Sequence, residues 1–177
     1  CASWIELACK VTDALEGTFQ FQEREILKEM AVNDPRKVIS ICHRKAEKED
    51  LLDEYYAAIV NSVNPSDKDE FRAIHTQLCD LNAYAYVTTN IDRGIEEVSL
   101  PGGGKKNVFD LTMWDKPDLR EVRNGNVFYL HGSKENIKKS IFTDENYLEF
   151  YRRPEIREFL NNIFGSDHCV LFVGYSQ

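Results

Sequence analysis

Three short apolar runs in the second half of the chain each stop at small or polar residues. The runs cover residues 84–87, 127–130 and 169–173, and they lead into the segments that contain Asn90, His131 and Ser176 respectively. Their β-branched and aromatic composition favours buried strands. The carboxyl ends of parallel strands lie on one edge of an open sheet, where ligands bind in the crevice outside it. We therefore expect the three polar segments to share one pocket.

Before the first of these runs the sequence predicts helices only. Ser3 and Glu6 have the spacing of a capping box, and apolar residues follow at helical intervals as far as Leu15. Further helices are expected over residues 21–31, from Pro35 through 42, over 50–63, and after a cap at 66–69. Five helices should thus precede the first strand.

The pattern then changes to alternating strands and helices. We expect a short helix at 93–98, a short strand at 108–111, and helices that begin at Thr143 and Pro154, the last ending near Gly165. This alternation predicts an α/β fold with a mostly parallel sheet. The prediction is one domain over 1–177, mainly helical over 1–82 and α/β over 83–177, with the helices as an insertion in the first half.

Composition narrows the class of protein. The chain has 177 residues, 42% hydrophobic and 29% charged, and its net charge of -8 argues against direct nucleic-acid binding, which needs a basic surface. Apolar runs stay far below the roughly 20 residues of a membrane span. Five scattered cysteines without a C-x-x-C pair indicate reduced thiols and no structural zinc. We expect a cytoplasmic protein that does not bind a membrane.

Several suggestive residues have ordinary explanations. The glycine-rich segment 101–106 lacks the spacing of a phosphate-binding loop and is better explained as a surface loop. His43 and His75 lie within helix patterns without a second metal ligand at helical spacing. Tyr147 and Tyr151 fit an aromatic stripe used for helix packing.

His131 has an ordinary explanation too, as a strand-end histidine bonded to a loop carbonyl, while Asn90 and Asp92 are common turn and cap residues. Their coincidence at one expected sheet edge favours a functional site. The two explanations remain open at this point.

The same segments resemble a known family. Thr89-Asn90-Ile91-Asp92 is similar to the T-Q-N-I-D element of the sirtuins, Leu130-His131-Gly132 to the strand that bears their catalytic histidine, and Gly174-Tyr175-Ser176 to their G-T-S element. The nearer resemblance is to the bacterial sirtuin-like branch of anti-phage defence proteins, with its T-T-N-x-D, L-H-G-S, F-T-x-x-x-Y and L-F-V-G-Y-S segments. The resemblance covers about residues 84–177, plus the opening helix at Ser3.

The chain also departs from that family. A G-A-G-x-S loop for the diphosphate of NAD is not present, so we expect the chain to be a fragment that begins after this loop and cleaves NAD weakly by itself. The paired C-x-x-C zinc module of deacetylating sirtuins is missing as well. We expect the extra helices of the first half to take the place of that lobe.

The resemblance implies a Rossmann-like sirtuin-type domain that hydrolyses NAD to nicotinamide and ADP-ribose. It implies catalytic roles for Asn90 and His131, and contacts to NAD from Thr88, Thr89, Asp92, Gly132, Gly174 and Ser176. The alternatives are an NAD-dependent protein deacylase or ADP-ribosyltransferase, and a non-catalytic module that senses NAD or ADP-ribose. The implied partners are NAD, a fused or associated sensor or effector domain, and further copies of the chain in a homo-oligomer.

Overall fold

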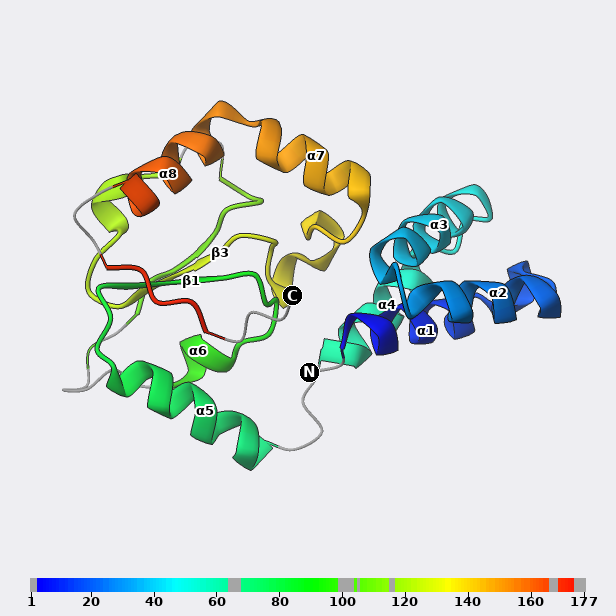
Figure 1. Ribbon diagram of the computed structural model, residues 1–177, viewed down its shortest axis with the longest axis horizontal. Helices are drawn as coiled ribbons and strands as arrows, with labels where there is room; N and C mark the ends of the chain where they lie inside the picture. The colour runs from blue at the N-terminus through cyan, green and yellow to red at the C-terminus, as the bar shows by residue number, and fades with distance from the viewer. Residues whose placement is uncertain are drawn as a thin grey trace.

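The computed structural model describes residues 3–63, 68–98, 104, 106–114, 117–165 and 169–173. Among these residues the sheet has three strands: β1 (Ala85–Thr88), β2 (Val108–Asp110) and β3 (Asn126–Tyr129). They are all parallel in the order β1-β3-β2 (Figure 1). All four residues of β3 are buried, as expected for a central strand with side chains covered on both faces. The predicted α/β class with a parallel sheet is confirmed.

Helices precede the sheet, as predicted. They are α1 (Trp4–Ala14), a 3₁₀ turn η1 (Glu16–Thr18), α2 (Phe21–Ala31), α3 (Pro35–Lys48), α4 (Leu52–Val63) and α5 (Lys68–Asp80). The capping box of α1 is present: Ser3 Oγ accepts from the Glu6 N–H at 3.2 Å, and Glu6 Oε2 accepts from the Ser3 N–H at 2.7 Å. Asp34 caps α3, and Pro35 occupies its first turn, where no intrahelical donor is needed.

Shorter helices alternate with the strands in the second half. They are α6 (Gly94–Glu97), the 3₁₀ segments η2 (Leu119–Glu121) and η3 (Lys134–Lys139), α7 (Asp144–Arg152) and α8 (Pro154–Gly165). Thr143 and Asn146 cap α7 reciprocally, so its predicted start is confirmed. Phe128 of β3 and Phe159 of α8 lie in one buried cluster, which fixes α8 against the sheet.

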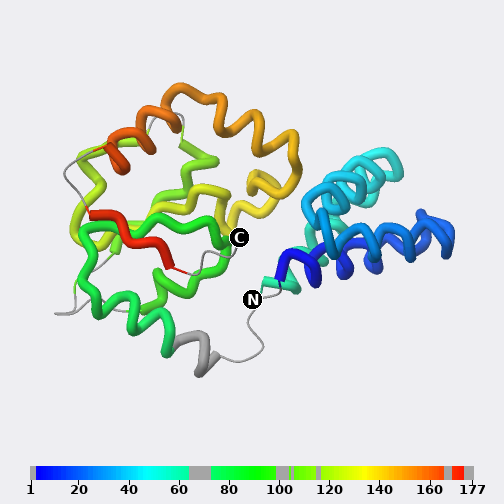
Figure 2. The backbone as a smooth tube through the Cα atoms, viewed as in Figure 1, coloured from blue at the N-terminus to red at the C-terminus, as the bar shows by residue number. Residues whose placement is uncertain are grey.

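The structure has a second, helical core. Buried residues of α1, α2, α3 and α4 form one apolar cluster, in which Val11, Val38 and Ile59 are completely buried. Figure 1 shows these four helices grouped beside the α/β part, and Figure 2 shows that the segment around η3 and the start of α7 lies next to them. Ile91 and Phe142 from the α/β part join this helical cluster.

The prediction of a strand over residues 169–173 is wrong. These residues have no strand assignment, and Leu171, Phe172 and Val173 are all more than half exposed. Phe172 stacks on Phe164 of α8, with ring centroids 6.0 Å apart. Apolar and β-branched composition expresses a tendency that tertiary context can override, and this segment stays outside the sheet that the described residues form. Gly174 and Ser176, predicted to bind NAD, lie outside the described residues.

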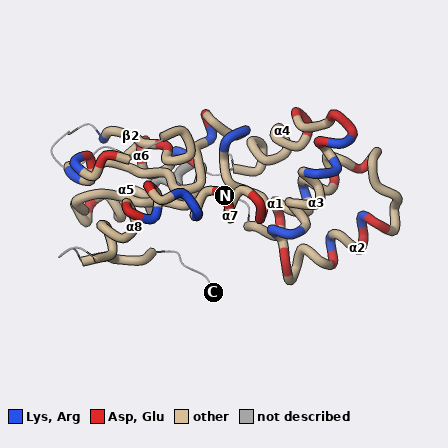
Figure 3. The backbone as a smooth tube through the Cα atoms, turned by 90° about the horizontal axis from the view of Figure 1, so that it is seen from above, with Lys and Arg blue, Asp and Glu red and all other residues tan. Residues whose placement is uncertain are grey.

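Figure 3 shows acidic and basic residues interspersed along the described backbone, on the helical group and on the α/β part alike. Within the described ranges, no helix is both long and apolar enough to cross a bilayer.

Candidate functional site

The ends of β1 and β3 lie side by side at one edge of the sheet. Thr88 is in register with Tyr129, and the Leu130 N–H donates to Thr88 O at 2.8 Å just beyond the last strand residue. Asn90 and His131 therefore follow neighbouring parallel strands at the same edge. Two of the three strands predicted to lead into the site thus end at the same edge of the sheet, and the shared pocket stays a prediction.

His131 is buried between two tyrosines of α7. Its side chain is only 6% exposed; Nε2 lies 2.7 Å from Tyr151 Oη and Nδ1 lies 3.2 Å from Tyr147 Oη. Both tyrosine rings meet the imidazole edge to face. The helical pattern by itself predicts a packing role for these tyrosines, and Tyr147 also ends the F-T-x-x-x-Y segment of the family resemblance. The signal that identifies them is their spacing of four residues, which puts both hydroxyls on one face of a helix.

The surroundings of His131 favour the neutral imidazole. Burial, and secondly the positive charge of Arg36, lower the pKa of His131 from 6.5 to about 4. Burial also raises the pKa of Tyr147 to about 12 and raises that of Tyr151. At neutral pH the ring therefore has one N–H and one lone pair, each next to a protonated phenol.

A tight connection holds His131 in place. Its carbonyl accepts from the Ile141 N–H at 2.8 Å, and the next residue, Gly132, has a φ of +92°. A Cβ on Gly132 would lie 2.7 Å from Ser140 Cα, so glycine is required both for the backbone conformation and for the space.

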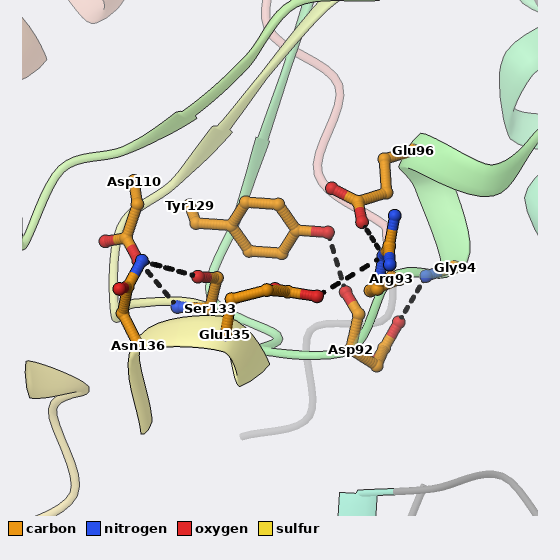
Figure 4. Close-up of polar contacts among 9 residues, drawn as sticks. All are labelled: Asp92, Arg93, Gly94, Glu96, Asp110, Tyr129, Ser133, Glu135 and Asn136. Atoms are coloured by element: carbon orange, nitrogen blue, oxygen red, sulfur yellow. Dashed lines mark hydrogen bonds and ion pairs between the residues drawn. The ribbon is translucent and has the colours of Figure 1, made fainter. Parts of the chain in front are cut away.

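Asp110 anchors the same connection from β2 (Figure 4). Its Oδ2 accepts from Ser133 N at 3.0 Å, from Ser133 Oγ at 2.8 Å and from Asn136 Nδ2 at 3.2 Å, while Oδ1 accepts from Thr112 N and Oγ1. No local pattern indicates this role of Asp110, because Ser133 and Asn136 lie more than 20 positions away along the chain. It is a structural anchor for the loop that begins at Gly132.

Asp92 shapes the turn after β1. Its buried carboxylate accepts from the Gly94 N–H at 2.9 Å at the start of α6, and its carbonyl accepts from Tyr129 Oη at 2.7 Å (Figure 4). Arg93 pairs with Glu96 and lies 3.5 Å from Glu135 Oε1. The carboxylate of Asp92 is thus engaged with backbone, and its predicted contact with nicotinamide stays a prediction.

The residues before Asp92 are more accessible. Thr89 and Asn90 are exposed, and the Asn90 N–H donates to Thr88 Oγ1 at 3.0 Å, which closes a local turn. Asn90 therefore lies at the surface after β1, whereas the buried His131 follows the neighbouring strand β3. This arrangement suits a reaction in which an amide orients polar groups and a histidine exchanges a proton.

Other places in the described residues have a weaker claim to function. A hollow of about 360 Å³ lies between η2 and α8, lined by Asp118, Arg120 and Glu158 among others, and none of its lining residues belongs to the strand ends. The described part of the chain contains no group of three or more His, Cys, Asp or Glu side chains arranged to hold a metal. His43 contacts Tyr56 in the helical core, and His75 is buried against Gly94.

Comparison with known proteins identifies the segment that contains this site. A family model described as SIR2-like domain matches residues 84–177, which include both strand ends, α7 and α8. Searches of the curated proteins and of the solved structures found no match.

Proposed function

Since the chain belongs to the SIR2-like domain family, which includes NAD-dependent enzymes, we propose that it hydrolyses NAD to nicotinamide and ADP-ribose. The observation that carries this proposal is that the buried imidazole of His131 and the exposed residue Asn90 follow neighbouring parallel strands at one sheet edge. The same edge is where ligands bind in open parallel sheets.

Hydrolysis requires two kinds of assistance. The bond from ribose C1′ to nicotinamide breaks with its electron pair leaving on the nicotinamide nitrogen, and positive charge develops on the sugar. Water then forms the new C1′–O bond and loses one proton. A group that accepts a proton and a group that orients the water and the ribose hydroxyls are therefore needed.

His131 is suited to the first role. A pKa of about 4 leaves a lone pair on one ring nitrogen throughout the neutral range, and the burial that lowers this pKa also makes the imidazole a weaker base than an exposed histidine. Tyrosine hydroxyls lie on both ring nitrogens, so a substrate hydroxyl reaches the ring only through one of them or in its place. In this proposal a proton lost by the ribose or the water passes to His131 by one of these two routes.

Asn90 is suited to the second role because an amide offers both donors and an acceptor. In the proposal Thr88, Thr89 and Gly132 line the ribose side, Asp92 faces the carboxamide, and Gly174 and Ser176 face the adenosine half. Gly132 directly follows His131 in the chain, and the backbone conformation of Gly132 leaves no room for a side chain.

The wider biological proposal rests on the sequence resemblance. It is an effector domain of a bacterial anti-phage defence protein, cytoplasmic, joined to or associated with a sensor domain, and working as a homo-oligomer. Protein deacylation, ADP-ribosyl transfer and non-catalytic sensing of NAD or ADP-ribose are the alternatives. Retention of both Asn90 and His131 favours chemistry over sensing.

Substitution of His131 and of Asn90 tests their proposed catalytic roles. In the intact protein, His131→Ala should lower the turnover of NAD by about 10² to 10⁴-fold, the usual contribution of a general acid or base. Asn90→Ala should lower turnover comparably with little change in NAD affinity. Asn161→Ala, an exposed amide on α8, is the matched control. Turnover like that of the wild type in His131→Ala would remove His131 from the mechanism.

Product analysis separates the competing functions. A hydrolase should release equal amounts of nicotinamide and ADP-ribose from NAD with no peptide present. NAD consumption that depends on an acyl-lysine peptide would contradict hydrolysis and favour a deacylase. Tight NAD binding without any product would favour a sensing module.

A further inference from the structure

One face of α3 contacts the beginning of α7 at three points spaced four residues apart. The Arg36 guanidinium lies 5.1 Å from the centroid of the Tyr147 ring, and Ser40 Oγ accepts from the Asp144 N–H at 3.0 Å. One helical turn further on, Arg44 Nη1 lies 2.8 Å from Glu145 Oε1. This face joins the helical first half to the helix that holds His131.

The three contacts differ in burial and in their contribution to stability. Arg44 and Glu145 are 59% and 57% exposed, and such surface pairs contribute little to stability. Ser40 is 2% exposed. It donates to Arg36 O at 2.9 Å and accepts the first N–H of α7, a donor that has no partner within its own helix. Ser40 therefore ties the α7 terminus directly to the backbone of α3.

The contact at Arg36 leads on to His131. Tyr147 lies under the guanidinium on one side, and its hydroxyl is the hydrogen-bond partner of His131 Nδ1 on the other. The side chains that contact the imidazole or act on its charge are thus Tyr147 and Tyr151 from α7 and Arg36 from α3. A shift of α7 by a fraction of its pitch would move both phenols together.

The helical half also holds the Asn90 side of the site. Ile91, between Asn90 and Asp92, is buried in the apolar cluster of α1 to α4, and so is Phe142 just before α7. Both sides of the edge are therefore supported by the same helical core.

We infer that Arg36 and Ser40 are positioning residues: through α7 and its two tyrosines they hold the ring of His131 in the orientation that the reaction needs. The expected effect of this positioning on kcat rests on the proposed NAD hydrolysis. The expected effect on the environment of the His131 ring does not. The helical first half therefore helps to position His131, and a displacement of α3 will change the reactivity of His131.

The test compares Arg36→Met, Arg36→Lys, Ser40→Ala and the control Arg44→Met in the intact protein. Histidine-labelled samples are titrated by NMR, and His131→Gln assigns the signal among the four histidines of the sequence. In Arg36→Met the pKa of His131 should rise from about 4, because a positive charge that opposes protonation is lost, and should stay below 6.5, because burial is the larger cause. Arg36→Lys keeps the charge and should keep the low pKa.

Kinetics provide the second measurement. Arg36→Met and Ser40→Ala should lower kcat for nicotinamide release by about 10- to 100-fold with KM little changed, as expected when a reactive group is slightly misplaced. Arg36→Lys should restore most of kcat. Arg44→Met should stay within about twofold of the wild type, because its exposed ion pair contributes little.

Three outcomes overturn the inference. The first is a His131 signal and titration unchanged in both Arg36→Met and Ser40→Ala. The second is an equal effect of Arg44→Met, which would mean general loosening of α3. The third is an active wild-type enzyme whose kcat is unchanged in both Arg36→Met and Ser40→Ala. Arg36 is exposed, so Arg36→Met decides the question even where Ser40→Ala does not fold. An inactive wild type would refute the proposed function, and the NMR titration would still decide this inference.

Discussion

His131 shows how a single residue can be poised for chemistry at a cost to stability. The folded protein keeps its imidazole neutral by burial, with Arg36 as a secondary cause, whereas the unfolded chain exposes it to water. The folded pKa is therefore lower than the unfolded value of 6.5. The unfolded state binds the proton more tightly, and protonation favours unfolding.

This difference predicts an acid-dependent loss of stability. The contribution of His131 is fully present above pH 6.5 and is lost as the pH falls towards about 4. A shift of this size corresponds to about 3 kcal/mol in the free energy of unfolding. Urea denaturation at a series of pH values measures it.

His131→Gln is the control, because it removes the titrating group and keeps a polar side chain of similar size. The difference in stability between the wild type and this variant should shrink as the pH is lowered from 6.5 to 4. A constant difference over this interval would contradict the lowered pKa.

At the scale of elements, the connection from β3 to η3 decides where the imidazole lies. Hydrogen bonds from Ile141 and to Asp110 hold this connection on either side of Gly132. A bond from the Lys134 N–H to Ile91 O at 3.0 Å ties it to the segment after β1. The two strand ends are thus joined through backbone as well as through the sheet.

Gly132→Ala should disrupt this connection. A left-handed conformation costs a non-glycine residue about 1 to 3 kcal/mol, and the new Cβ would also lie 2.7 Å from Ser140 Cα. We expect a loss of stability at or above the upper end of that range, together with a changed His131 NMR signal. Denaturant unfolding and the NMR spectrum measure the two effects.

Gly17→Ala in η1 is the matched control. No atom lies within 4 Å of a Cβ at Gly17, so the same change should alter stability by less than about 1 kcal/mol. Equal effects at the two positions would show that the Gly132 conformation is not required.

At the scale of the molecule, the helical core is joined to the α/β part by a few side chains. The ion pairs across the junction, Arg44–Glu145 and Lys138–Asp53, are exposed and contribute little. Ile91 and Phe142, in contrast, are buried among residues of the helical cluster. The junction therefore depends on apolar burial, and the two cores should unfold together.

Phe142→Ala tests this coupling. Phe142 is 4% exposed, and removal of a buried phenylalanine side chain costs about 3 to 5 kcal/mol. We expect the free energy of unfolding to fall by that amount, and the helical signal and the tyrosine environment should separate into two transitions. Circular dichroism and tyrosine fluorescence, followed in the same denaturant series, measure both. Leu148→Ala on α7, where the side chain is 58% exposed, should leave stability within about 0.5 kcal/mol.

Much of the fold could be predicted because its signals are local. Capping residues such as Ser3, Asp34 and Thr143 satisfy backbone donors within their own first turn, so a helix start can be identified from a few neighbouring residues. The position of Asn90 and His131 at the same edge, each after a neighbouring strand, follows from the direction shared by all strands of a parallel sheet. Those features were determined by the sequence itself.

Tertiary structure alone decided the rest. Arg36, Asp110 and the tyrosine pair act on the His131 region through contacts between residues far apart in the chain, and no local pattern indicates which helix faces will meet. The apolar run 169–173 has the local composition of a strand, and no local pattern indicates that it lies outside the sheet of the described residues. Hydrophobicity and β-branching express a tendency to be buried in a sheet, but the available neighbours decide whether a segment pairs, packs on a helix or stays exposed.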